Sequence, residues 1–179
     1  MSTLKVNSIQ NTSGANNLGR ILQVKQTMMD NNLYWANATD WTDVTGLNAT
    51  ITPATTSSKI LISVQCKIAT AHNGDNVAAL ALKRGGSLLS YNTYQSWGYG
   101  DYHYYFSEND DTLGGPQATF TRLDSPSTTS STTYQVVHRP GSSSWYNNNT
   151  YINRSNRSDN DWYNCARVRS TITLMEVSA

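Results

Sequence analysis

Residues 59–68 read KILISVQCKI and form the clearest strand pattern in the chain. One parity of this segment is apolar, and the other carries Ser63, Gln65 and Lys67. Such an alternation is typical of a strand with one buried face, so we expect the polar parity to face solvent or a neighbouring sheet. The apolar parity is expected to face inward, and its members are Ile60, Ile62, Val64, Cys66 and Ile68.

Further strand patterns flank this segment on both sides. Residues 77–84 and 87–91 enclose Gly85-Gly86, a pair that favours the positive φ angles of a tight hairpin turn. No long segment shows a helical period, and Ser, Thr and Asn make up about a third of the chain, a composition that suits strands and turns. Other strands are expected at residues 21–29, 41–51, 102–107, 117–124, 132–139, 150–153 and 168–177.

These patterns predict an all-β chain, with residues 21–179 as one antiparallel β-sandwich of jelly-roll type. Residues 1–20 differ from the rest, because a short alternating segment is followed by a polar one rich in Asn and Gly. A segment this short buries little by itself, so we expect an extended N-terminal arm that needs a partner surface, or a first strand of the body. Its apolar residues are Leu4, Val6, Ile9 and Leu18.

Charge and hydropathy exclude several classes of partner. The net charge is +1 and no block of Lys and Arg occurs, so we expect no nucleic-acid partner. No apolar run approaches the length that spans a bilayer, and the N-terminus lacks the pattern of a secretory signal. We expect synthesis in a cytoplasm and Cys66 as a small buried hydrophobe; the alternative, a disulfide with Cys165 across the sandwich, is disfavoured by a reducing compartment.

The sequence offers no motif for catalysis. His72, His103 and His138 stand in no metal-binding spacing, and nucleophile-elbow, P-loop and dinucleotide motifs are missing. The acidic residues are mostly Asp in turns, where Asp supports the backbone. We therefore expect no enzyme, no catalytic residues, no metal site and no cofactor.

Aromatic residues are concentrated in two windows, residues 91–106 and 145–163, which hold thirteen of the eighteen Trp, Tyr and Phe residues. Asn, Ser, Gln and Gly are interspersed with them, a composition typical of binding surfaces that stack on sugar rings. The alternative is that these rings fill the core or a subunit interface. The candidate ligand-binding residues, at expected loop tips, are Trp97, Tyr99, Trp145, Asn147, Asn148, Asn149 and Trp162.

Several segments resemble structural proteins of tailed bacteriophages, especially those of marine cyanophage type. The N-terminal STLKVNSIQNTSG carries the resemblance, as do WTDVTGL at residues 41–47, SSKILI at 57–62, LDSP at 123–126 and STITLMEV at 170–177. It is weakest at residues 91–115 and 141–164, which contain most of the two aromatic windows. The resemblance implies a virion component, often a tail-fibre or head-fibre module, and transfers no catalytic residue.

We therefore expect a non-enzymatic virion structural protein, a fibre-like or knob-like module that is assembled in the host cytoplasm. Its arm would attach it to other virion proteins, with Leu4, Val6, Ile9 and Leu18 as anchors, and the body would form a homotrimer that contacts the host surface. The alternative is a carbohydrate-binding, lectin-like receptor binder of host surface glycan, or a small polysaccharide depolymerase. Sequence leaves open whether the protein sits on head, collar or tail.

Overall fold

The computed structural model describes residues 20–35, 40–70, 76–89, 101–106, 116–140, 149–154 and 168–178. Within these ranges the chain forms eleven strands and no helix. Their bounds are β1 Ile21–Met29, β2 Leu33–Trp35, β3 Thr42–Ile51, β4 Lys59–Thr70, β5 Asn76–Arg84, β6 Ser87–Leu88, β7 Tyr102–Phe106, β8 Gln117–Asp124, β9 Thr132–Pro140, β10 Thr150–Ile152 and β11 Ser170–Val177.

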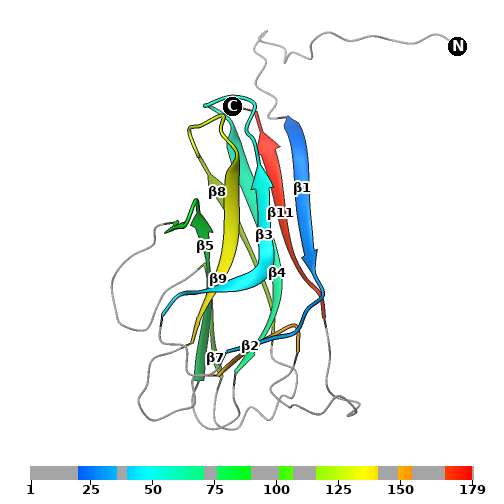
Figure 1. The fold of residues 1–179 in the computed structure, drawn as a ribbon, viewed down its shortest axis with the longest axis vertical. Coiled ribbons are helices and arrows are strands. Elements are labelled where there is room, and N and C mark those ends of the chain that lie inside the picture. Colours follow the sequence, from blue (N-terminus) through cyan, green and yellow to red (C-terminus); the bar gives the residue numbers. More distant parts are fainter. Residues whose placement is uncertain are drawn as a thin grey trace, which may run out of the picture.

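The strands form two antiparallel sheets that pack face to face (Figure 1). The first sheet has the order β1-β11-β4-β10-β2, and β8 pairs with β4. Strand β4 pairs with β11 along residues 59–65 and with β10 along residues 68–70, so the short strands β10 and β2 continue the lines of β11 and β1. The second sheet has the order β3-β9-β5-β6, and β7 pairs with β5. The all-β sandwich expected from the sequence is confirmed.

The core lies between the two sheets and is built from one parity of each long strand. The apolar parity of β4 faces inward as predicted: the side chains of Ile60 through Ile68 at even positions are fully buried. In the same sheet, β11 adds Ile172 and Leu174 to this layer. From the opposite sheet, β9 adds Val136. Cys66 is a free, buried thiol, and burial raises its pKa to about 12, so it behaves as a small hydrophobe.

The other parity of β4 departs from the prediction at Lys67. Gln65 is exposed and Ser63 half-buried, as expected, but Lys67 is buried. Every residue from Cys66 to Thr70 is buried, so both faces of β4 are covered at this end of the strand. The simple alternation therefore holds only along residues 59–65 of β4. Burial lowers the pKa of the Lys67 ammonium.

The hairpin at Gly85-Gly86 is confirmed. Both glycines have positive φ, +55° and +88°, and β5 pairs with β6 across them. Most other strands begin and end within two residues of the predicted bounds, but β6 is shorter than expected. Strand β2 was not predicted, because a three-residue strand is too short to show an alternation.

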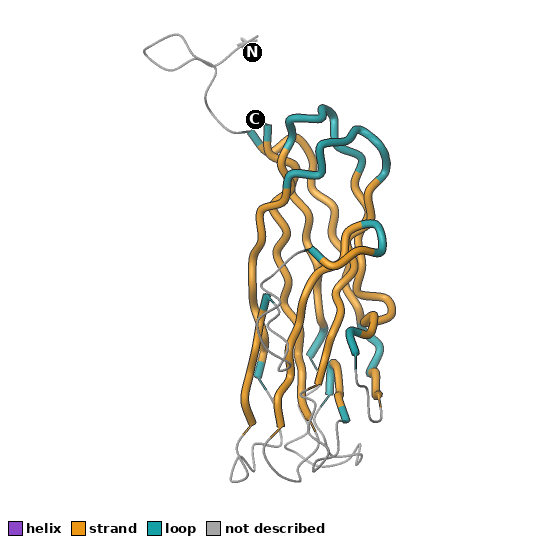
Figure 2. The backbone as a smooth tube through the Cα atoms, turned by 90° about the vertical axis from the view of Figure 1, so that its left-hand side faces the viewer, coloured by secondary structure: helices purple, strands orange, loops and turns teal. Residues whose placement is uncertain are grey.

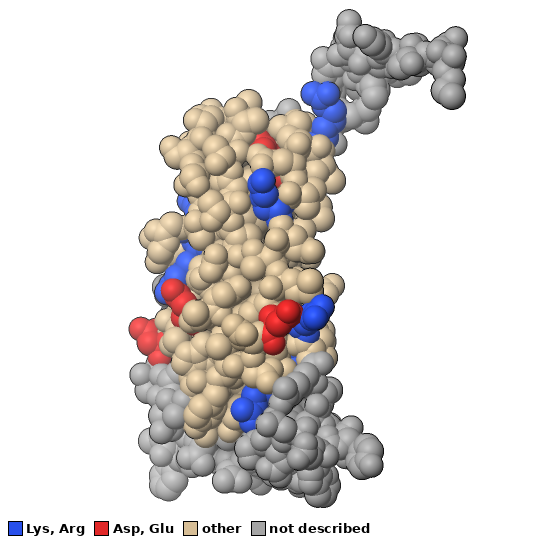
Figure 3. Space-filling model, turned by 45° about the vertical axis from the view of Figure 1, so that its right-hand side comes forward, with Lys and Arg blue, Asp and Glu red and all other residues tan. Residues whose placement is uncertain are grey.

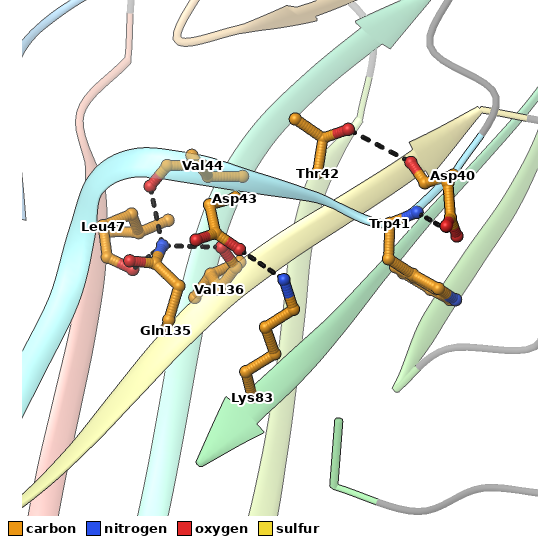
Figure 4. Close-up of polar contacts among 9 residues, drawn as sticks. All are labelled: Asp40, Trp41, Thr42, Asp43, Val44, Leu47, Lys83, Gln135 and Val136. Atoms are coloured by element: carbon orange, nitrogen blue, oxygen red, sulfur yellow. Dashed lines mark hydrogen bonds and ion pairs between the residues drawn. The ribbon is translucent and has the colours of Figure 1, made fainter. Parts of the chain in front are cut away.

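A bulge bends β3 in its middle (Figure 4). The register with β9 shifts between Asp43 and Asn48, and Gly46 has a φ of +89°, which favours glycine. The Gln135 amide of β9 fills the bulge and donates to the carbonyls of Val44 at 2.9 Å and Leu47 at 3.2 Å. A single side chain therefore holds the bend of β3.

Replacing Gln135 with alanine should lower the free energy of unfolding by about 2 kcal/mol. The reason is that the partly buried carbonyls of Val44 and Leu47 lose the side-chain amide that donates to them. Chemical denaturation of Gln135→Ala and of Thr133→Ala, an exposed neighbour on the same strand, measures this. An equal effect of the two substitutions would show that Gln135 does not hold the bulge.

The two ends of the sandwich differ. At one end lie Arg20, Ser178 and the connections 52–58 and 125–131 (Figures 1 and 2). The backbones of Arg20 and Ser178 are joined there, since the Ser178 N–H donates to the Arg20 carbonyl at 2.9 Å. The opposite end carries Trp35, Thr70, Asn76 and the strand ends around Asn149 to Arg154. We call these the terminus end and the loop end.

A buried carboxylate fastens the terminus end. Glu176 of β11 accepts hydrogen bonds from Gln23 Nε2 at 2.6 Å and from the Ala54 N–H at 2.7 Å. Burial alone would raise its pKa, but hydrogen bonds from Ser58, Gln23 and Ala54 together outweigh burial and hold the pKa below its ordinary value. Strands β1 and β11 and the connection 52–58 are thereby tied together.

Candidate functional site

Most residues singled out from the sequence lie outside the described part of the chain. This holds for the ligand candidates Trp97, Tyr99, Trp145, Asn147, Asn148 and Trp162, and for the anchor candidates Leu4, Val6, Ile9 and Leu18. Asn149 is described and precedes β10 at the loop end. Of the candidates named from the sequence, Asn149 is the one within the described residues.

An aromatic pair lies on the outer face of the first sheet at the loop end. Tyr34 of β2 and Tyr151 of β10 stand opposite each other in register, with ring centroids 5.1 Å apart and an interplanar angle of 31°. Tyr34 is 50% exposed and Tyr151 is half-buried. Because side chains alternate along a strand, their neighbours Trp35 and Thr150 face inward.

Polar groups surround the Tyr151 ring. The Arg154 guanidinium carbon lies 5.2 Å from the ring centroid, within range of a cation–π contact. The side chain of Asn149 forms a hydrogen bond with the Tyr151 hydroxyl. Partial burial, and next the Tyr34 phenol, raise the pKa of Tyr151 above its ordinary value, so the hydroxyl stays protonated at neutral pH. We call Tyr34, Tyr151, Arg154 and Asn149 the tyrosine platform.

The platform combines groups that suit a polar ring such as a sugar. Two tilted phenol rings offer faces for stacking, while an amide and a guanidinium supply hydrogen bonds at their margin. Such a surface can bind a hydroxyl-rich ligand, and its four residues include no pair of carboxylates of the kind that most glycoside hydrolases use.

A buried amide holds the platform in place. Asn153, at the end of β10, donates from Nδ2 to the carbonyls of Met29 at 2.8 Å and Asn31 at 3.0 Å. Its Oδ1 accepts from the Ser170 hydroxyl at 2.5 Å, and its own N–H donates to the Lys67 carbonyl at 3.1 Å. Asn153 thereby joins the end of β1 to β4, β10 and β11 beneath the tyrosines.

The interior below the platform is polar. His138 of β9 is fully buried and stacks on Trp35, with ring centroids 4.3 Å apart. Among the described residues its two ring nitrogens have no hydrogen-bond partner, and neither do the hydroxyls of Thr70 and Thr150. Thr70 and Thr150 stand opposite each other in register, and Thr150 stands opposite Trp35. Burial lowers the pKa of His138 to about 4, so the imidazole is neutral at pH 7.

Sequence reasoning located part of this site. Asn149 and Tyr151 fall in the second aromatic window, but Tyr34 lies more than fifty residues before the first window. The signal that was available is the segment Asn31 to Trp35, where two amides precede two aromatics. This segment does not stand out as an aromatic cluster, because it contains only two aromatic residues.

Other kinds of site find little support in the described ranges. No group of three or more His, Cys, Asp and Glu side chains gathers there in a way that could hold a metal ion. No helix in those ranges is long and apolar enough to cross a membrane. Charged side chains are scattered over the face drawn in Figure 3, and no large patch of one sign is visible on it.

Comparison with protein-family models and with curated proteins finds no match for this chain.

Proposed function

We propose that the protein is a bacteriophage virion structural protein, a knob-like module that is attached to the particle by its N-terminal arm. The observation that carries this proposal is the separation of the two ends. The arm joins the body at Arg20, at the terminus end, whereas Pro140 and Val168, the described residues on either side of the second aromatic window, and Asn149 within it lie at the loop end. A module built this way can be fixed at one end and meet a second molecule at the other.

The strand order supports a jelly-roll topology for this module. The long strands follow the orders β1-β11-β4-β8 and β3-β9-β5-β7. Consecutive long strands thus lie mostly in opposite sheets, as they do when a strand ribbon wraps around a barrel-like core in two Greek keys. Jelly-roll modules occur in viral particles, in agreement with the resemblance of the sequence to phage structural proteins.

The proposed anchor is residues 1–20, with Leu4, Val6, Ile9 and Leu18 filling pockets on a neighbouring virion protein. An extended segment can add to an exposed sheet edge, where backbone hydrogen bonds give affinity and alternate side chains give specificity. Attachment at Arg20 supports this role, since the arm leaves the body beside the chain's other terminus.

Deleting residues 2–16 should abolish incorporation into particles while leaving the sandwich folded, because the strands of the body begin at Ile21. Particles from cells that express the truncated protein in place of the full chain are purified and probed for it by immunoblot. Circular dichroism and thermal unfolding of the truncated protein serve as the folding control. Normal incorporation, or loss of folding, would contradict the anchoring role.

A second candidate function is favoured by the tyrosine platform. Tyr34, Tyr151, Arg154 and Asn149 together offer stacking faces and hydrogen bonds at the loop end, a composition that suits a lectin-like binder of host surface glycan. The platform is compatible with the structural role, because a knob can also be the part that meets the host.

Replacing Tyr34 with alanine should weaken binding to host surface polysaccharide about 2- to 10-fold, the loss expected for about 0.5–1.5 kcal/mol of stacking. Tyr34→Phe keeps the ring and should retain the affinity, which makes it the matched control. Binding is measured by retention on immobilised polysaccharide, and release of reducing ends is assayed in parallel. Cleavage would favour a depolymerase. If the unaltered protein is not retained, glycan binding is contradicted and the structural role is the one that remains.

A further inference from the structure

Strand β1 presents its apolar parity to the outside of the sandwich. Val24 and Met28 are each 53% exposed, while Gln23, Lys25 and Thr27 share the parity that pairs with the inward-facing residues of β11. In a strand with alternating apolar and polar residues the apolar side chains usually face inward, whereas in β1 they face outward. Ile21 and Leu22, at the start of β1, are exposed as well.

The outward apolar residues of β1 continue into a row across the whole sheet. In register, Val24 stands opposite Met175 of β11, Met175 opposite Leu61 of β4, and Leu61 opposite Leu123 of β8. The two edge residues are the most exposed, with Leu123 at 55%. Ile21 and Val177 are also opposite each other beside this row. Isolated surface hydrophobics are ordinary, but a row in contact over four strands is a patch.

Two further rows of this outer face, on the loop-end side of the apolar row, carry no charge. The next row is Gln26, Thr173, Ser63 and Thr121, and the Gln26 amide is tied down by a 2.8 Å hydrogen bond to the Thr173 hydroxyl. The row after it is Met28, Thr171, Gln65 and Thr119. Lys59 stands opposite Val177 on the terminus-end side of the apolar row, and the exposed Arg169–Asp30 ion pair lies beside Met28. The outer face of the other sheet carries the ion pair of Asp43 with Lys83, at 2.7 Å.

We propose that the outer face of the β1-β11-β4-β8 sheet is the surface through which copies of this chain associate. This inference locates the subunit interface of the homotrimer expected from the sequence, and it rests on the proposed function of a virion module. These three rows carry no charge, so two copies can pack through them without burying an unpaired charge. A charged partner surface placed on the same rows would bury its charges without counter-charges.

The size of the face agrees with this role. Four strands about 4.8 Å apart and seven residues at about 3.4 Å each cover roughly 450 Å² of plane per copy. Around a three-fold axis each copy shares its face with two neighbours, so the three faces together bring about 1,400 Å² of plane into the assembly, within the size range of specific interfaces when summed over the trimer.

The direction of the apolar row fits rotation about an axis parallel to the strands. The row lies at one level along the strands, from the β1 edge to the β8 edge. Rotation about such an axis keeps every copy at the same level, so the rows of neighbouring copies meet. The same rotation keeps all terminus ends on one side, as attachment to a particle requires.

The test is the mass of the full chain in solution, measured by light scattering over a range of protein concentrations. The unaltered protein should have three times the 19.8 kDa of one chain. The double variant Val24→Lys and Leu123→Lys should fall to the mass of one chain, because charges at both edges of the row oppose association. Thr50→Lys with Ser87→Lys adds the same charge to exposed positions of the other sheet and should keep the mass of the unaltered protein.

A second variant guards against a failure to fold. Gln26→Glu with Thr121→Glu changes exposed polar residues of the next row and should also dissociate the protein, with unchanged circular dichroism. If either double variant of this sheet face keeps the mass of a trimer, the proposed interface is wrong, although the trimer itself is not. Equal dissociation of the control would overturn it too. A single-chain mass of the unaltered protein would overturn both the interface and the trimer.

Discussion

Replacing Asn153 with alanine is expected to lower the free energy of unfolding by about 4 kcal/mol, since three hydrogen bonds of a buried amide are lost at once. The Met29 and Asn31 carbonyls lose the donor Asn153 Nδ2, and the fully buried Ser170 hydroxyl loses the acceptor of its proton. Asn153 also has a φ of +62°, a conformation that Asn tolerates and Ala does not. Denaturant unfolding followed by tryptophan fluorescence measures the loss.

Asn153→Gly is the matched control for the backbone part of this effect. Glycine adopts positive φ freely, so its cost reports the hydrogen bonds alone and should be smaller than that of alanine. The substitution should also loosen the tyrosine platform, because Asn153 joins β10 to the end of β1. A loss of less than about 1 kcal/mol for Asn153→Ala would show that the amide network is not a main support of the loop end.

Stability should fall as the pH drops from 6.5 toward 4, because of His138. Its pKa in the folded protein is about 4, lowered by burial from an ordinary value of 6.5. Between these values the unfolded chain binds a proton that the folded protein does not, so acid favours unfolding over that window. The shift corresponds to a loss of up to about 3 kcal/mol, complete near pH 4.

His138→Leu should remove this dependence, and the comparison is made between the two proteins at each pH. The stability of the variant relative to the unaltered protein should rise by about 3 kcal/mol between pH 7 and pH 4. Glu176 does not interfere above its ordinary pKa of 4.5, because its lowered pKa makes its contribution disappear only at more acid pH. Parallel pH profiles of the two proteins would contradict a buried neutral His138.

The fold was largely predictable because its strands are long and follow simple local rules. The alternation of Ile60 to Ile68 gave the inner face of β4, and Gly85-Gly86 gave the hairpin by their positive φ. The sandwich follows from these rules, since each apolar parity needs a facing sheet. The pairing of β4 with β11, β8 and β10 was not predictable, because register between distant strands depends on tertiary packing.

The departures have identifiable physical causes. Lys67 is buried because both faces of β4 are covered at the loop end, which no alternation can reveal. Val24 faces outward because β1 is placed by its register with β11, where Glu176 receives Gln23 from the inner parity. Gln135 lies within the predicted strand 132–139, where no local pattern sets it apart, yet it fills a bulge made by a segment about ninety positions away.

The candidate site was less accessible to sequence reasoning than the fold. Asn149 and Tyr151 fall in the predicted window, whereas Tyr34 joins them only through the pairing of β2 with β10. Asn153 shows no signal in the sequence, because its role comes from carbonyls of residues 29 and 31, more than a hundred positions away. Sites assembled from short strands depend on contacts that local patterns do not encode.

The claim that this chain is a virion component is tested most directly by locating it on particles. Gold-labelled antibodies against the folded protein are applied to purified phage particles and viewed by electron microscopy. We expect label at one fixed position on each particle, and loss of that label from particles made with the chain lacking residues 2–16. Particles that carry no label, while the protein is abundant in the host lysate, would contradict it.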